Sequence, residues 1–153
     1  MTTERTEDYL EALDVIISEK GYAQVKDVSK LLGVGPPSVT EMFQKLGEAG
    51  YINYKKYSGV TLTLKGKKIA KKTRKKHDTL KNFLLILGVN RKIANEDACR
   101  IEHVVNTETM DRLTKFVDFA QHVEDGPMWL DHFKHFYETG EYRECPVKEQ
   151  DDL

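Results

Sequence analysis

Along the first fifty residues, apolar side chains recur every three or four positions, in three segments that end near glycines. This spacing places them on one face of a helix, so the pattern predicts helices over residues 5–19, 25–32 and 35–50. Two prolines suit the first turn of the third helix. The side chains expected to face a core are Leu10, Leu13, Ile16 and Ile17, then Val25, Val28, Leu31 and Leu32, then Val39, Met42, Phe43 and Leu46.

The period then changes from helical to alternating. Residues 51–56 and 60–64 predict two short strands around a turn at Ser58 and Gly59. Three helices followed by a hairpin form the order of a winged helix-turn-helix. In that unit the third helix enters the major groove of DNA and the hairpin lies along the DNA backbone.

A long helical pattern from Thr63 to Leu87 connects this unit to the second half of the chain. Two further helices are predicted over residues 95–105 and 107–123, and the aromatic stretch after them predicts a short covering segment. The apolar residues expected in a helical bundle or a dimer face are Ile101, Val104, Val105, Met110, Leu113, Phe116, Val117 and Ala120.

The predicted fold class is therefore mostly α with a small β-hairpin. We expect a winged helix-turn-helix DNA-binding domain over residues 1–72, a helical metal-binding and dimerisation domain over residues 73–140, and a C-terminal tail over residues 141–153.

The formal net charge is only −1, but the two halves of the chain carry opposite charge. Residues 1–80 hold 15 Lys and Arg against 10 Asp and Glu (+5), and residues 81–153 hold 9 against 15 (−6). A basic half favours a polyanionic partner such as DNA, because its cations release counterions on binding. If only the charge is considered, a solvent-exposed lysine face without any partner is an equally good explanation. Residues 65–76 include eight basic residues in twelve on the long helix, of which only the first turn is expected to approach phosphate.

Targeting and membrane signals are absent from the sequence. No apolar run approaches the roughly 20 residues of a membrane span, and the N-terminus lacks an apolar targeting segment, so a cytoplasmic location is expected. Cys99 and Cys145 lie far apart and offer no disulfide framework. In a reducing compartment both thiols are expected to be free for a metal or for chemistry.

Cys99, Glu102 and His103 fall at i, i+3 and i+4 of a predicted helix and so face one point. Packing, thiol catalysis and metal binding are all open for this set. Catalysis is disfavoured because no glycine-rich segment lies nearby to stabilise an oxyanion. The metal interpretation gains from further groups of suitable type at Asp8, Glu11 and His77.

From residue 1 to about 125 the chain resembles the diphtheria-toxin-repressor family of metal-dependent transcriptional regulators. The motifs that carry the resemblance are EDYLEAL, GYAQVKDVSKLLGVGPPSVTEMFQKLGEAGYI, LTLKGKKIA, His77 and DACRIEHVV. The resemblance implies a metal-activated repressor of metal-homeostasis genes, a homodimer that binds a palindromic DNA operator, and not an enzyme. Longer members continue into an SH3-like domain, which this chain is expected to lack.

By this resemblance, the residues on the family's metal-ligand positions are Asp8, Glu11, His77, Cys99, Glu102 and His103. Iron-responsive members resemble the chain at Cys99 but usually have methionine where Asp8 stands. Manganese-responsive members share Asp8 and Glu11 but have glutamate in place of Cys99. Lys81 and Asn95 stand where the iron subgroup has ancillary ligands, so a shared two-ion cluster is expected. Because a thiolate favours softer ions, Fe(II) is the expected metal, with Mn(II) as the alternative and Co, Ni or Zn as substitutes.

We expect polar groups at the start of the third helix to reach base edges and lysines of the same domain to contact phosphates. The residues are Pro37, Ser38, Thr40 and Glu41 for bases, and Lys26, Lys45, Lys55 and Lys56 for phosphates. In the tail, His132 and His135 form an HxxH pair for which packing is favoured over a further ion. Two other functions stay open: a metal-storage protein, and a thiol-dependent enzyme that uses Cys99.

Overall fold

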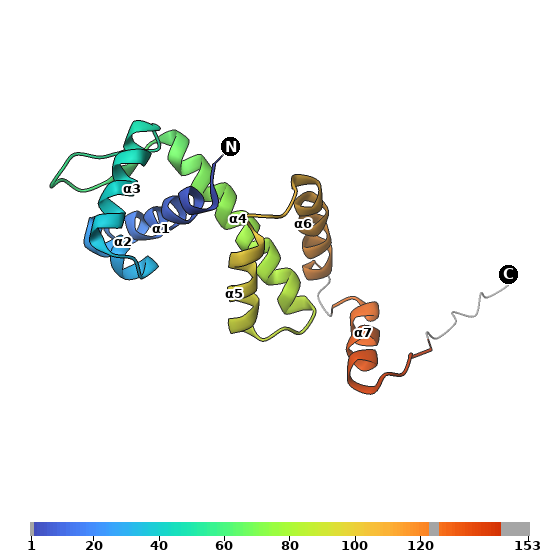
Figure 1. The fold of residues 1–153 in the computed structure, drawn as a ribbon. Helices are drawn as coiled ribbons and strands as arrows, with labels where there is room; N and C mark the ends of the chain where they lie inside the picture. Colours follow the sequence, from blue (N-terminus) through green and yellow to red (C-terminus); the bar gives the residue numbers. More distant parts are fainter. Residues whose placement is uncertain (1, 123–125, 145–153) are drawn as a thin grey trace.

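The computed structural model describes residues 2–122 and 126–144. In chain order its elements are α1 (Glu4–Lys20), α2 (Val25–Leu32), α3 (Pro36–Glu48), β1 (Ile52–Asn53), β2 (Thr61–Leu62), α4 (Leu64–Ile86), α5 (Arg91–Ile101), α6 (Thr107–Gln121) and α7 (Met128–Thr139). Figure 1 shows α1 to α3 and the hairpin at one end of α4, α5 and α6 beside its other end, and α7 beyond α6. This arrangement confirms a mostly helical winged helix-turn-helix protein with a second helical unit.

Local capping groups set the boundaries of α1 and α4, which explains why the sequence predicts these two helices closely, whereas α5 lies four residues earlier than the predicted 95–105. The hydroxyl of Thr3 accepts a hydrogen bond from the Thr6 backbone N–H at the start of α1, and Thr63 does the same for Gly66 at the start of α4. Gly21 ends α1 in the left-handed region at a φ of 83°. Glycine is favoured in this region because it has no Cβ to clash with the backbone.

The helices α1, α2 and α3 pack with the hairpin around one core, and together they form what we call the reading head. Its centre is the fully buried Phe43 of α3, and Tyr54 stacks on that ring edge-on at 5.5 Å between centroids. The fully buried aliphatic residues around it are Leu10, Leu13, Val28, Val39 and Val60. This matches the apolar faces that the sequence predicts, apart from Leu31, which is half exposed.

The two strands are shorter than predicted. Only Ile52 pairs with Leu62 and Asn53 with Thr61, and a single bridge joins Ala23 to Val60. Residues 54–59 lie outside the sheet. The chain turns there, and the Ser58 N–H donates to the Lys55 carbonyl at 2.9 Å. This loop forms the tip of the wing.

Gly66 lets the first turn of α4 approach the backbone before β1. A Cβ at this position would lie 2.0 Å from the carbonyl oxygen of Tyr51. Gly66→Ala is therefore expected to lower the free energy of unfolding by at least about 2 kcal/mol, measured by urea unfolding, because backbone atoms must move to relieve the clash. Gly47→Ala in α3 is the control, since its nearest neighbour would lie 3.7 Å away. It should be neutral or stabilising by up to about 1 kcal/mol, and equal losses in both variants would contradict this account.

The second unit has a smaller core between α4, α5 and α6. Leu80, Ala98 and Met110 are buried there, and Ile101, Val105 and Leu113 pack against them. Val104, which the pattern placed on the same apolar face, is 78% exposed. It lies in the turn after α5 and no longer follows the helical spacing.

The aromatic tail differs from the expected covering segment. Residues Met128 to Thr139 form α7, none of whose residues is buried. The Trp129 ring of α7 lies 5.6 Å from the ring of Phe116 in α6. Its aromatic residues recur at helical spacing, which explains the helix. Cys145 lies outside the described residues.

Candidate metal centre

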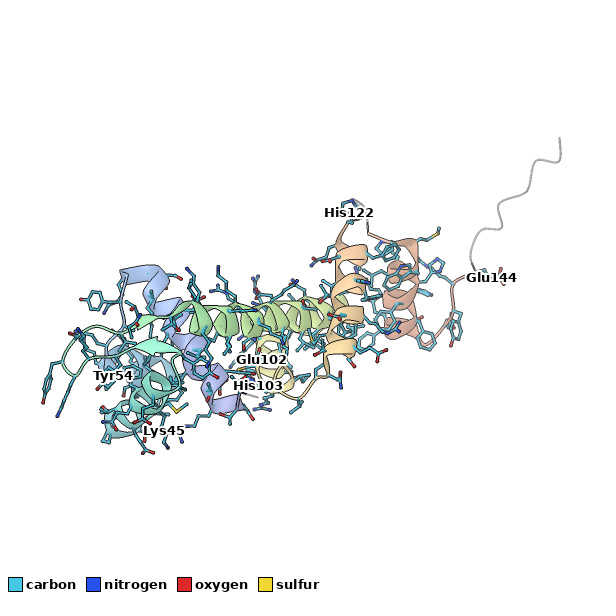
Figure 2. The ribbon with its side chains drawn as sticks, turned by 90° about the horizontal axis from the view of Figure 1, so that it is seen from above. Lys45, Tyr54, Glu102, His103, His122 and Glu144 are labelled. Atoms are coloured by element: carbon cyan, nitrogen blue, oxygen red, sulfur yellow. The ribbon has the colours of Figure 1, made fainter. Side chains whose placement is uncertain are left out.

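Three segments far apart in the sequence meet at one site: α1, α4 and the turn after α5. The helix α4 packs against both α1 and α5, and the turn after α5 brings Glu102 and His103 next to α1 (Figure 2). The sequence predicted one helix through residue 105, but α5 ends at Ile101. Glu102 keeps a helical backbone as its C-cap, and His103 lies in the following turn.

The His103 ring is held between two acidic residues of α1. Its Nδ1 lies 2.8 Å from Oε2 of Glu7, and its Nε2 lies 2.9 Å from Oδ1 of Asp8 and 3.3 Å from Oε1 of Glu102. The side chain is only 3% exposed. Although Nε2 is close to two carboxylates, it has no hydrogen-bond partner, and neither has Oε1 of Glu102. Two buried polar atoms therefore face each other unsatisfied.

The second histidine, His77 of α4, occupies the other side of Glu102. Its Nδ1 lies 2.8 Å from Oε2 of Glu102 and its Nε2 lies 3.0 Å from Oδ1 of Asn95. Glu102 itself has no exposed side-chain surface. A fully buried carboxylate needs positive charge nearby, because desolvation of an unpaired charge is costly.

When no metal ion is bound, the electrostatics of the site favour the protonated forms of its carboxylates and imidazoles. Burial raises the pKa of Asp8, and it also raises that of Glu11, on which the charge of Glu102 acts in the same direction. The hydrogen bond to Glu102 raises the pKa of His77. For His103, burial lowers the pKa, but the hydrogen bond to Glu7 and the charges of Asp8 and Glu102 outweigh it, so the net pKa is raised above 6.5. A protonated imidazole is thus the positive charge available to these acids.

Stability of the metal-free protein is expected to fall as pH rises above the unfolded histidine pKa of about 6.5, because both histidines have folded pKa values above their unfolded values. The stabilisation is fully present below the unfolded pKa and is lost as pH rises through the folded one. Urea unfolding in the presence of a chelator measures it. His77→Gln should flatten the dependence, whereas His122→Gln, at the exposed C-cap of α6, should leave it unchanged. A dependence of opposite sign would refute this assignment.

The structure brings four of the six predicted ligands, Asp8, His77, Glu102 and His103, into direct contact. Cys99 and Glu11 lie near enough for the charge of Glu102 to raise their pKa values, yet neither joins the closest group of ligand atoms. Cys99 is exposed. The predicted convergence of Cys99 with Glu102 and His103 assumed one continuous helix, which ends before Glu102.

Sequence reasoning missed three residues of the site. Glu4 lies with Asp8 and His103 in a group whose ligand atoms are all within 4.8 Å of one another. Glu7 and Asn95 hold the two imidazoles. Glu4 precedes Asp8 by four positions and Glu7 precedes Glu11 by four, a helical spacing that could have revealed both acids. The contact of Asn95 with His77 depends on the packing of α5 against α4.

The donor set fits a divalent cation. Unsatisfied buried atoms at His103 Nε2 and Glu102 Oε1 supply one nitrogen and one oxygen, and Asp8 supplies a second oxygen. Their separations of 2.9 and 3.3 Å from Nε2 match the roughly 3 Å between adjacent donors around an ion with bonds of about 2.2 Å. In protein metal sites the second nitrogen of a ligating histidine usually donates to a carboxylate or carbonyl oxygen. Glu7 and Asn95 are placed for that role.

The tail pair His132 and His135 does not gather such a set. Across residues 2–122 and 126–144, the Glu4 group is the one place where three or more potential ligand residues come so close together. The raised pKa of Cys99, caused by partial desolvation of the thiol and by the charges of Glu102 and Asp8, also disfavours a nucleophilic thiolate. It therefore argues against a thiol-dependent enzyme.

The predicted DNA-contact residues lie in α2, in α3 and in the loop of the hairpin. Figure 2 labels Lys45 of α3 and Tyr54 of the hairpin in the reading head, with Glu102 and His103 between them and His122. Pro37 is exposed at the start of α3, and the Thr40 hydroxyl donates to the Pro36 carbonyl at 3.1 Å. The exposed residues Glu41 and Lys45 form an ion pair at 2.7 Å, so in the free protein they neutralise each other. Ser38 is half-buried and Lys26 is exposed.

The lysines of the wing and the first lysine of α4 differ in whether their ammonium groups bind elsewhere in the protein. Lys55 and Lys56 are exposed, and Lys56 lies over the Tyr57 ring at 5.3 Å. In the first turn of α4, Lys65 donates to the Ala49 carbonyl at 3.0 Å and covers the Tyr51 ring. It therefore anchors α3 and the wing to α4. Among the helices of the described residues, including the long α4, none combines the length and the apolar character that a membrane span requires.

Comparison with known proteins bears on both halves of the chain. The family model described as "Iron dependent repressor, N-terminal DNA binding domain" matches residues 1–60, and that described as "Iron dependent repressor, metal binding and dimerisation domain" matches residues 63–130. The HTH-type transcriptional regulator MntR of Bacillus subtilis is 44% identical over 121 residues, which cover 79% of this chain and 85% of that protein. The same regulator of Bacillus pumilus is 42% identical over 130 residues, 85% of this chain and 90% of that protein.

Solved structures agree with these relatives. The structure of the manganese regulator SloR superposes with a TM-score of 0.66 at 30% identity, covering 78% of this chain and 55% of that one, so the chain spans about half its length. That of IdeR from T. acidophilum gives a TM-score of 0.66 at 27% identity, covering 73% and 53%. With two family models and relatives above 40% identity over most of its length, the chain belongs to the diphtheria-toxin-repressor family of metal-dependent transcriptional repressors.

Proposed function

We propose that this protein is a manganese-responsive repressor in which a bound ion joins the reading head to the second helical unit. The observation that carries the proposal is the unsatisfied His103 Nε2, 2.9 Å from Asp8 Oδ1. His103 follows α5 and Asp8 belongs to α1, so one ion held by both would link the two halves of the chain. Asp8, His77, Glu102 and His103 would hold it, with Glu11 nearby.

The chain's own residues prepare this site. Glu7 holds Nδ1 of His103, which leaves Nε2 directed towards Asp8 and Glu102. Asn95 holds Nε2 of His77, which leaves Nδ1 directed towards Glu102. A bound divalent ion supplies the positive charge that these acids need. In its absence burial, and to a lesser degree the neighbouring acids, disfavour the charged forms, so the pKa values of Asp8 and Glu11 are raised.

Packing within the reading head carries the effect to DNA. The helix α1 packs against α2, and α2 packs against α3, which holds the predicted base contacts. Fixing α1 against the turn after α5 therefore fixes α3 relative to the second unit. By linkage, an ion that favours the DNA-competent arrangement raises operator affinity by the same factor by which DNA raises affinity for the ion.

The ligand chemistry favours manganese over the iron that the sequence suggested. Fe(II) was expected because of the Cys99 thiolate, but Cys99 is exposed and outside the closest ligand group. That group consists of two carboxylates and one imidazole. Carboxylate-rich sites suit manganese, and one similar structure is that of a manganese regulator. Fe(II) remains the competing ion.

We further propose that two copies bind a palindromic operator. A two-fold dimer would present two α3 helices to half-sites about 34–36 Å apart, one turn of DNA. The family model of the second unit is described as a dimerisation domain. Exposed apolar residues on that unit suited to such an interface are Ile93, Val104 and Phe119. The domain boundary at residue 72 lies within the continuous α4 and stays part of this proposal.

One anaerobic titration tests the function. A duplex selected from a random pool in the presence of Mn(II), and a scrambled duplex, are titrated with protein in Mn(II), Fe(II) or chelator, with fluorescence anisotropy as the readout. Mn(II) is expected to raise affinity for the selected duplex by about 5- to 150-fold over chelator, and more than Fe(II) does. An affinity for the selected duplex that is the same with Mn(II), with Fe(II) and with chelator would refute metal activation. A stronger response to Fe(II) would refute only the choice of metal, and equal affinity for scrambled DNA would favour metal storage.

A further inference from the structure

We propose that Glu4, in the first turn of α1, is an additional ligand of the metal site. The inference rests on the proposed function, because it concerns the same ion that Asp8 and His103 would hold. Its observation is separate: a carboxylate oxygen of Glu4, one of Asp8 and a ring nitrogen of His103 all lie within 4.8 Å of one another. Trans donors around an ion with bonds of about 2.2 Å lie about 4.4 Å apart, so the three can share one ion with modest adjustment.

An acidic cluster alone would not make a site, but this one contains a buried and unsatisfied donor. The His103 side chain is only 3% exposed, and its Nε2 lacks a hydrogen-bond partner while it lies 2.9 Å from Asp8 Oδ1. The nitrogen is therefore directed into the cluster that Glu4 completes. Since Glu7 occupies the other ring nitrogen, Nε2 is the one free to bind an ion.

The position of Glu4 on α1 explains why its carboxylate faces this point. Glu4, Asp8 and Glu11 stand at i, i+4 and i+7, which places all three on one stripe of the helix. Glu4 is exposed and its carboxylate can move to meet an ion.

Ligation by Glu4 would extend the site to the very start of α1. Cys99 is exposed and outside this group, whose two carboxylates both come from α1. The ion would then be held by two positions one helical turn apart on the reading head, and the first turn of α1 would become ordered against the turn after α5.

Two substitutions separate ligation from simple charge attraction. Glu4→Gln keeps the shape and removes the charge, and Glu4→Asp keeps the charge but shortens the side chain by one methylene. If Glu4 binds the ion, both variants should lower Mn(II) affinity by about 10-fold or more in isothermal titration calorimetry. Glu19→Gln, an exposed acid at the other end of α1, should match the unchanged protein.

The outcomes distinguish this proposal from the function on which it rests. Unchanged affinity in both variants, or loss in Glu4→Gln alone, would overturn ligation by Glu4 while the metal response of the protein stands. Failure of the unchanged protein to bind Mn(II) would instead remove the proposed function. Far-UV circular dichroism of each variant checks that α1 remains folded, and the Mn(II) electron paramagnetic resonance spectrum should change between the unchanged protein and Glu4→Gln.

Discussion

Glu102→Gln is expected to lower Mn(II) affinity by at least about 100-fold and to remove the metal dependence of operator binding. Glu102 is fully buried, and its two oxygens face the two histidines, Oε2 towards His77 and Oε1 towards His103. Glutamine has nearly the same shape, but it presents one oxygen instead of two and carries no charge. A neutral amide is a poor ligand for a divalent ion, so the site loses its central anion.

Calorimetry measures the Mn(II) affinity, and anisotropy measures operator binding with Mn(II) and with chelator. Glu108→Gln makes the same chemical change at an exposed position of α6, where the carboxylate pairs with Arg112 at 3.3 Å, and should alter neither quantity. Thermal unfolding with chelator shows whether Glu102→Gln is still folded. A folded Glu102→Gln protein with undiminished Mn(II) affinity would show that the buried carboxylate is structural only.

Replacing Lys55 and Lys56 together by alanine is expected to weaken operator binding by at least about 100-fold near 0.1 M salt, with Mn(II) affinity unchanged. Both lysines are exposed at the tip of the wing and neither forms an ion pair within the described residues. A lysine bound to a phosphate releases condensed counterions, so the slope of log affinity against log salt should fall in magnitude by about 0.9 for each phosphate that the variant no longer neutralises.

Anisotropy titrations at several salt concentrations measure that slope. The matched control replaces Lys92 and Lys134, two exposed lysines of α5 and α7, by alanine. It removes the same charge from the second unit and should leave the slope nearly unchanged. Equal slopes for the unchanged protein and the wing variant would mean that the wing does not contact phosphate.

Most of the fold could be predicted because its determinants are local. The end of α1 at Gly21, the start of α4 at Thr63 and the apolar stripe that buries Phe43 each depend on residues within a few positions. Hydrophobic spacing and caps express such short-range preferences directly. The wing was harder, because its strands form only where Ile52 and Asn53 meet partners across the hairpin.

The candidate site was predictable in its residue types and less so in its geometry. A carboxylate and an imidazole next to each other at Glu102 and His103, with a further acid at Asp8, indicate metal binding in the sequence itself. Their placement relative to Cys99 was extrapolated from helical periodicity past Ile101, where the helix ends. The expectation of iron came from the softness of the Cys99 thiolate.

By itself, the sequence determined the order of the helices, the winged helix-turn-helix and the chemical types that a metal site needs, because periodicity and composition act along the chain. Only the tertiary structure decided which of those groups meet. The packing of α1 and α5 on α4 places Glu7 and Asp8 against His103, ninety-five and more positions away, and selects Glu4 over Cys99 for the closest ligand group. Such contacts depend on where whole helices pack, which no local pattern encodes.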